Sequence, residues 1–179
     1  HKDREVVDLL YFPTGGGKTE AYLGLMAFVI ANRRLRASNT SEYNSDGGVT
    51  AILRYTLRLQ TTQQRDRITK MVLAAELIRQ KTYPKYGTEP ISIGFWVGGG
   101  VTPNKFEELV EKADKPGEAK RKRNLLYKQL LTCPFCGKPL TEEEFYIDPE
   151  QKSVAIYCAD NTCLFYKYKQ KRIQIPVYL

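Results

Sequence analysis

The feature that most constrains this chain is a glycine-rich turn between two apolar runs. The turn is the stretch Pro13-Thr14-Gly15-Gly16-Gly17-Lys18-Thr19-Glu20. The run before it, Val6–Phe12, is typical of a short buried strand, and the run after it, Ala21–Ile30, is apolar almost all round and predicts a buried helix. A strand, a glycine-rich turn ending in Gly-Lys-Thr and a helix together are the context of a phosphate-binding loop.

The residue types in this turn suit the binding of a nucleoside triphosphate. Three consecutive glycines let the backbone curl so that amide N–H groups point at one phosphate, and the helix N-terminus adds partial positive charge. Lys18 is expected to reach the β- and γ-phosphates and the Thr19 hydroxyl to hold Mg²⁺, so these two are the candidate catalytic residues. The predicted ATP site comprises seven consecutive residues: Thr14, Gly15, Gly16, Gly17, Lys18, Thr19 and Glu20. Phe12 stands where the strict pattern has glycine, and an ordinary glycine-rich turn is the alternative.

Composition limits what kind of protein surrounds this loop. With 179 residues, 42% hydrophobic and 27% charged, the chain is long enough for one full core with a small appended module. No apolar run reaches the length of a membrane span and the N-terminus does not resemble a secretory signal, so we expect a cytoplasmic protein without a membrane partner. The only histidine is His1, which effectively excludes histidine-based catalysis.

The charge balance indicates what the protein binds. Lysine and arginine number 28 against 20 aspartate and glutamate residues, which gives a net charge of +8 and a pI of about 9.3. This excess suits a polyanionic partner such as nucleic acid, although an ordinary basic surface is an equal alternative. A run of four cations, Lys120-Arg121-Lys122-Arg123, lies in a predicted helix, where a solvated helix face is again the simpler interpretation.

Periodicity predicts alternating strands and helices after the first helix. The expected elements are strands at Val49–Thr56 and Ile91–Val97 and helices at Leu57–Lys81, Pro103–Lys115 and Glu118–Leu131. The long helix should bury one face, formed by Ile68, Met71, Val72, Ala75 and Ile78. Such alternation is the signature of an α/β fold with a parallel sheet covered by helices on both faces. A last apolar strand begins at Ile173, with Pro176 arguing against full pairing there.

All four cysteines lie between these last elements, in two pairs. Cys133-Pro134-Phe135-Cys136-Gly137 has the shape of a metal-binding knuckle, and Cys158 and Cys163 form a looser pair 21 residues further on. Four thiolates without a histidine favour closed, tetrahedral, structural Zn²⁺. Disulfides or four free thiols are the alternatives.

The segment between the two cysteine pairs reads as a β-hairpin. Residues Glu144–Asp148 and Ser153–Tyr157 alternate in the manner of strands, with a turn at 148–151. Asp148 follows an apolar run and so imitates a Mg²⁺-binding aspartate, but its place in the hairpin predicts a turn residue. We find no other convincing acidic ligand for Mg²⁺ in the chain.

The glycine-rich turn resembles motif I of superfamily 2 helicases and translocases. Arg54–Gln64 resembles their motif Ia, with Tyr55 in place of the usual proline, and Gly98-Gly99 resembles an element that touches nucleic acid in that family. The resemblance covers most of residues 6–131 and looks most like large bacterial helicases of the DISARM phage-defence type. It implies that Thr56, Arg58, Gly98 and Gly99 contact nucleic acid. DNA is the favoured partner, with RNA as the alternative that the sequence leaves open.

The resemblance implies a P-loop, RecA-like lobe at 1–131, an inserted zinc ribbon at 132–172 and the start of the next core strand at 173–179. In that family an Asp-Glu pair follows this strand and a second lobe carries an arginine finger; neither is in this sequence. The chain is thus expected to be part of an ATP-dependent helicase or translocase, inactive alone, whose partners are nucleic acid and the missing C-terminal lobe. The alternatives are a zinc-ribbon nucleic-acid-binding module with a vestigial phosphate loop, or a P-loop small-molecule kinase.

Overall fold

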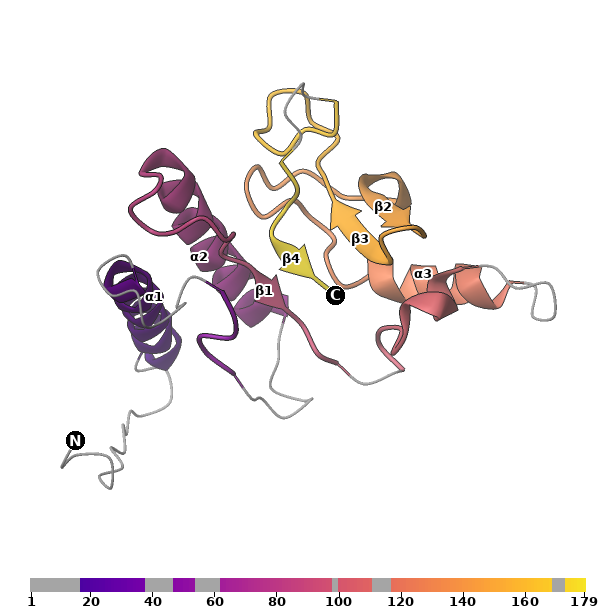
Figure 1. Ribbon diagram of the computed structural model, residues 1–179. Coiled ribbons are helices and arrows are strands. Elements are labelled where there is room, and N and C mark those ends of the chain that lie inside the picture. The colour runs from indigo at the N-terminus through magenta and orange to yellow at the C-terminus, as the bar shows by residue number, and fades with distance from the viewer. Residues whose placement is uncertain (1–16, 38–46, 54–61, 98–99, 111–116, 169–172) are drawn as a thin grey trace.

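The computed structural model describes residues 17–37, 47–53, 62–97, 100–110, 117–168 and 173–179 (Figure 1). Two long helices lie at one side of the molecule, and the cysteine-rich region with its hairpin lies at the other. The elements in chain order are α1 (Lys18–Ala37), α2 (Thr62–Lys81), β1 (Ile93–Gly94), the short 3-10 helix η2 (Phe106–Leu109), α3 (Glu118–Tyr127), the 3-10 helix η3 (Glu142–Glu144), β2 (Phe145–Asp148), β3 (Ser153–Ile156) and β4 (Val177–Tyr178).

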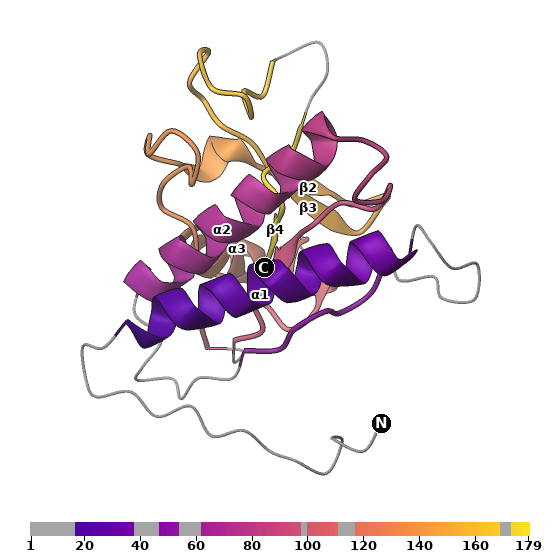
Figure 2. The ribbon, with the colours of Figure 1, turned by 90° about the vertical axis from the view of Figure 1, so that its left-hand side faces the viewer.

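Helices α1 and α2 lie side by side (Figure 2) and share a small apolar core. Ile68 and Val72 of α2 are buried with Ile91, and the α1 residues Leu23, Met26 and Ile30 pack against them. The prediction that the first helix is buried all round is wrong: the side chain of Phe28 is 65% exposed, and Leu25 and Val29 are exposed too. Among the described elements α1 packs mainly on α2, and a helix with one main packing partner buries mainly the stripe that faces it.

Buried polar residues hold this helix pair to the loop that follows α2. The Glu76 carboxylate accepts hydrogen bonds from Arg79 Nε (2.8 Å), Arg79 Nη2 (2.7 Å) and the Ile91 N–H (2.7 Å). Arg79 also donates to the carbonyls of Gly87 and Thr88, and Arg34 of α1 donates to the Glu89 carbonyl. Ile78, predicted on the buried face, is instead 53% exposed. The charged pair Glu76–Arg79 is therefore buried at the end of α2 where the apolar pattern predicted a buried Ile78.

The chain returns from the cysteine-rich region to pair with β1. Strand β4 lies parallel to β1, with Ile93 opposite Val177 and Gly94 opposite Tyr178. The Ile93 N–H donates to the Pro176 carbonyl (3.0 Å) and the Phe95 N–H to the Tyr178 carbonyl (2.9 Å). Pro176 has no N–H, but its carbonyl still takes part in the ladder. Two parallel strands are thus joined across more than eighty residues of sequence.

Several predicted elements are shorter than expected or differ in type. Residues 49–53 form no strand, since no described segment pairs with them and Ile52 is exposed. The helix expected from Pro103 is only the 3-10 turn η2, because Lys105 and Val110 on either side are extended. Helix α3 ends at Tyr127, since Leu131 already bonds to the N–H of Leu140 in the next turn. The strand expected at 6–12, residues 54–61 and residues 111–116 lie outside the described part, so the predicted larger parallel sheet stays a prediction.

The larger core joins the cysteine-rich region to α2, α3 and β4. Its fully buried side chains include Leu126, Ile156, Phe165 and Ile175. Leu73 of α2 also belongs to it. The Ile175 N–H donates to the Ile156 carbonyl (2.8 Å), which fastens the last segment to the hairpin. The cysteine-rich region therefore packs directly on the elements that precede and follow it.

The hairpin between the cysteine pairs is confirmed. Strands β2 and β3 are antiparallel, with Phe145 opposite Ile156 and Asp148 opposite Ser153. The Asp148 carboxylate accepts hydrogen bonds from the N–H groups of Glu150 (2.9 Å) and Gln151 (3.0 Å). Asp148 is therefore a turn residue, as its place in the sequence predicted.

Candidate metal centre

The first cysteine pair sits on a tight turn whose backbone aims both thiols inward. Thr132 and Pro139 form an antiparallel bridge. Inside it the Cys133 N–H donates to the Lys138 carbonyl and the Gly137 N–H to the Cys133 carbonyl, each at 2.8 Å. Gly137 has a φ of +75°, a conformation that a side chain disfavours, so the glycine after Cys136 is what permits the turn. We call residues 132–139 the knuckle.

The second pair is held by a loop that folds back on β3. The Cys158 N–H donates to the Phe165 carbonyl (2.8 Å) and the Lys167 N–H to the Cys158 carbonyl (3.0 Å). Within the loop, Asp160 accepts from the N–H (2.8 Å) and hydroxyl (2.6 Å) of Thr162. The Asp160 N–H points at Cys158 Sγ and the Phe165 N–H at Cys163 Sγ, at 3.5 and 3.4 Å. Backbone donors of this kind stabilise a thiolate.

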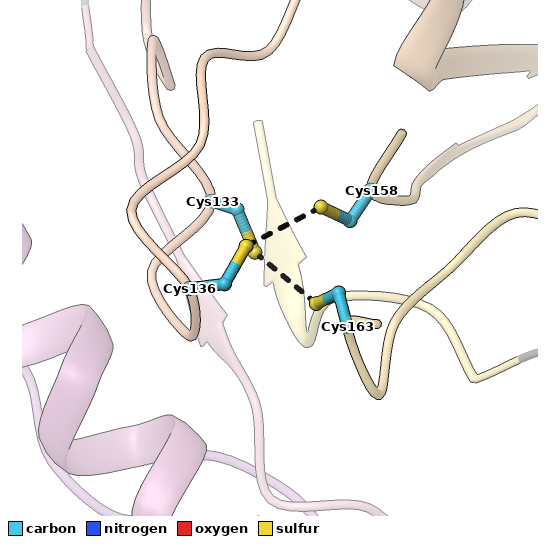
Figure 3. Close-up of side chains that lie close together, drawn as sticks. All are labelled: Cys133, Cys136, Cys158 and Cys163. Carbon is cyan, nitrogen blue, oxygen red and sulfur yellow. Dashed lines mark hydrogen bonds between the residues drawn. The ribbon is translucent and has the colours of Figure 1, made fainter. Parts of the chain in front are cut away.

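The four sulfur atoms converge from the two loops on one point (Figure 3). All lie within 4.8 Å of one another. Cys133 Sγ is 3.9 Å from Cys163 Sγ, and Cys136 Sγ is 3.5 Å from Cys158 Sγ. A disulfide needs about 2.0 Å, so these contacts are not disulfides. Four thiolates placed about 2.3 Å from a tetrahedral Zn²⁺ stand about 3.8 Å apart, which is close to these two separations and within the 4.8 Å spread of the four sulfurs.

The surroundings of the sulfurs suit a cation. Cys133, Cys158 and Cys163 are buried, and Cys136 is half-buried. Burial raises the pKa of Cys158 to about 11, and burial likewise raises the pKa of Cys163. Burial also acts to raise the pKa of Cys136, but hydrogen bonds from the Lys138 N–H and with the other three cysteines together lower it overall. A bound metal deprotonates such thiols outright. Since all four positions are sulfur, the site is closed and suits a structural role.

A buried carboxylate ties the hairpin to the second cysteine loop. Glu144 Oε2 accepts from the N–H and hydroxyl of Thr141, both at 2.8 Å, and Oε1 accepts from Lys167 Nζ at 3.1 Å. Burial acts to raise the pKa of Glu144, but these hydrogen bonds lower it overall, so the carboxylate stays charged. Because the Lys167 backbone also bonds to Cys158, Glu144 fixes where that cysteine lies.

The described part of the predicted ATP site forms the start of α1. Gly17 has a φ of +74°, and its carbonyl accepts from the Ala21 N–H at 3.1 Å. Lys18 and Thr19 follow as the first helical residues and are half-exposed. Thr14, Gly15 and Gly16 lie outside the described residues, so the full cradle stays a prediction. The residues that are described fit it, since a flexible glycine leads into the N-terminus of a long helix.

Glu20 has a partner that the sequence did not reveal. Its Oε1 lies 2.5 Å from Arg67 Nη1 of α2, and both side chains are more than half exposed. The pair links the first turn of α1 to the start of α2. The two residues are 47 positions apart, and no local pattern points from one to the other.

The residues predicted to contact nucleic acid, Thr56, Arg58, Gly98 and Gly99, all lie outside the described residues. Part of the basic run has another role. Lys122 forms an ion pair with Glu108 (2.5 Å), and Arg123 Nε donates to the Leu109 carbonyl (2.6 Å). These two residues fasten α3 to η2, whereas Lys120 and Arg121 are exposed.

No helix among the described ranges combines the length and apolar character needed to cross a membrane.

Comparison with known proteins gives one informative relative. The chain is 48% identical over 184 aligned residues to the DISARM protein DrmA of Bacillus paralicheniformis. The alignment covers 99% of this chain but only 16% of the relative. No family model matches the chain, and no solved structure matches it. The chain is therefore similar, over nearly its whole length, to one segment of a much larger DISARM protein.

Proposed function

We propose that this chain is part of an ATP-driven nucleic-acid motor of a DISARM phage-defence system, and that it carries the first nucleotide-binding lobe with a structural zinc ribbon inserted. The observation that carries the proposal is the 48% identity to DISARM protein DrmA across 99% of the chain. At that identity two chains of this length share a fold, so the segment is the counterpart of one in DrmA.

The start of α1 supports the nucleotide-binding part of the proposal. Lys18 and Thr19 stand at the N-terminus of a twenty-residue helix, directly after a glycine in the left-handed conformation. Lys18 would hold the phosphates of ATP, and Thr19 would ligate the Mg²⁺ that neutralises their charge. Glu20, the last residue of the predicted ATP site, is ion-paired with Arg67.

The parallel pair β1–β4 supports the placement of the zinc ribbon as an insertion. The chain leaves the β1 segment, forms α3 and the cysteine region, and then returns to the edge of β1. A segment that begins and ends beside the same strand can be added to a lobe without changing its sheet. The ribbon shares the larger buried core with α2 and β4, so it would be a packed insertion rather than a loosely attached one.

ATP binding by the zinc-loaded chain tests the proposal. Mg²⁺–ATP should bind measurably, and Lys18→Ala should weaken binding roughly ten- to hundredfold, because a charge-assisted contact of about 1.5–3 kcal/mol is lost. Lys81→Ala is the matched control. Lys81 is an exposed lysine at the C-terminal end of α2, and this variant should bind ATP as the parent chain does. Titration calorimetry measures both. A chain that binds no ATP but does bind nucleic acid would instead favour a zinc-ribbon binding module.

A further inference from the structure

A hollow lies where the zinc knuckle faces helix α2. It has a volume of about 300 Å³, and its wall on the helix side is formed by Asp66 and Lys70. The opposite wall is the knuckle itself, residues 132–137. Cys133 and Cys136 border the hollow, but Cys158, Cys163 and the described residues of the predicted ATP site do not line it.

The two walls are fastened together. Arg65 Nη1, one residue before Asp66, donates to Gln129 Oε1 at 2.8 Å. Gln129 Nε2 in turn donates to the carbonyls of Leu125 (2.9 Å) and Val101 (3.0 Å). Gln129 lies just before the knuckle, so this chain of hydrogen bonds fixes the distance between α2 and the knuckle. A hollow formed in this way needs little reorganisation when a ligand enters.

An aromatic ring stands at the edge of the hollow. Phe135 belongs to its lining, and its side chain is 47% exposed. The ring packs edge-on against the fully buried Phe165, with centroids 5.7 Å apart and planes at 68°. Because the metal ligands Cys133 and Cys136 flank it, the backbone of Phe135 is held as well. Its exposed face is therefore a fixed apolar platform beside a polar hollow.

The charges in the hollow divide it into two parts. Lys70 is exposed and forms no ion pair with a described residue, so its ammonium group is available to an anion. Asp66 lies one helical turn before it and disfavours a phosphate on its own side. A carboxylate there can accept a hydrogen bond from a base N–H group instead. A ring for stacking, a cation for phosphate and an acceptor for base N–H groups are the parts that recognise a nucleotide unit.

We propose that this hollow binds one nucleotide of a single-stranded nucleic acid, with its base stacked on Phe135 and its phosphate at Lys70. A single strand is required because bases in a duplex have no free face for the ring. The inference rests on the proposed function for the path of the strand, since α2 begins a few residues after Thr56 and Arg58, which are predicted to contact nucleic acid. The knuckle thereby extends that path.

The experiment measures binding of a labelled oligothymidine to the zinc-loaded chain by fluorescence anisotropy. Phe135→Leu keeps apolar packing on Phe165 but removes the stacking ring, and it should weaken binding about five- to 150-fold. Phe135→Trp should restore binding. Lys70→Gln should reduce the slope of log affinity against log salt by about 0.7, the value for one phosphate contact on a single strand. Tyr146→Leu, an exposed aromatic residue on β2 outside the hollow, is the control and should change nothing.

The outcomes separate this inference from the proposed function. Suppose that the parent chain binds both ATP and oligothymidine, and that Phe135→Leu binds oligothymidine as tightly as the parent does. This result overturns the inference but keeps the proposed function, and it points to a protein partner in the hollow. Loss of ATP binding with stacking-dependent DNA binding overturns the motor and keeps the inference. A chain that binds no oligonucleotide overturns both. If Phe135→Leu lowers the zinc content, the salt slope of Lys70→Gln decides, because Lys70 lies outside the knuckle.

Discussion

The helix pair α1–α2 and the cysteine-rich region are built in opposite ways. The cysteine-rich region, residues 132–168, has a nearly continuous buried core that includes Phe145, Ile156 and Phe165, with four convergent thiols beside it. The helix pair has a core of three buried residues among those described, and the buried Glu76–Arg79 pair within α2 fastens that helix to residues 87–91. Phe28 and its apolar neighbours on α1 are exposed.

This difference shows that one chain can be stabilised by two unrelated means. In the cysteine-rich region we expect the ordering of two loops to depend on a metal that draws four thiolates together. In the helix pair it depends on whether a buried carboxylate keeps all its hydrogen bonds. The two regions share Leu73 of α2 as a point of contact. Perturbations aimed at one region should therefore leave most of the other folded.

The largest effect should follow removal of zinc. Chelation, or Cys133→Ser, should unfold residues 132–168, because metal binding at such sites contributes apparent free energies of about 10–16 kcal/mol. Purified chain should contain about one zinc ion. Hydrogen exchange followed by mass spectrometry should show loss of protection in β2 and β3 and retained protection in α2. Thr132→Ser is the control, because Thr132 precedes Cys133 but is not one of the four cysteines. An equal loss of amide protection in α2 would show that the two regions unfold as one unit.

A smaller effect, confined to the other region, is expected for Glu76→Ala. The change leaves the Arg79 guanidinium buried without its carboxylate and removes the acceptor of the Ile91 N–H. Removing one partner of a buried pair typically costs about 3–5 kcal/mol. Glu20→Ala, which breaks the solvent-exposed ion pair with Arg67 in the same helix pair, should cost at most about 1 kcal/mol. Urea unfolding followed by hydrogen exchange of the α2 amides measures both changes in the free energy of unfolding. Loss of zinc from Glu76→Ala would contradict the separation of the two regions.

The smallest effect is an acid dependence of the helix pair. Burial acts to raise the pKa of Glu76, but hydrogen bonds from Arg79, the Ile91 N–H and Gln80 lower it overall. A carboxylate with a lowered folded pKa contributes its full stabilisation above the ordinary value of 4.5 and loses it as the pH falls through the folded value. Protection of α2 should therefore decline below about pH 4.5. Glu76→Gln, less stable at neutral pH, should lack this decline; the same decline in both chains would assign it to another group.

Local sequence was sufficient wherever a feature depends on neighbours in the chain. The knuckle follows from Cys133, Cys136 and Gly137, because a tight turn with a left-handed glycine is a local structure. The hairpin and its turn at Asp148 follow from alternation and turn chemistry. Most of α2 follows from periodicity. In each case the backbone hydrogen bonds join residues that are near one another in the sequence. The local sequence pattern is therefore enough to predict the structure.

Tertiary contacts decided the rest. The sequence by itself determined that four thiols would gather, and the fold decided that Cys133 lies beside Cys163 and Cys136 beside Cys158. It also decided that Glu76 rather than Ile78 is buried, that η2 is a single turn, and that Arg67 meets Glu20. Periodicity records which side chains are apolar but not whether a neighbour arrives to cover them. Burial and long-range pairing belong to the packed chain, because each depends on partners that are tens of residues away.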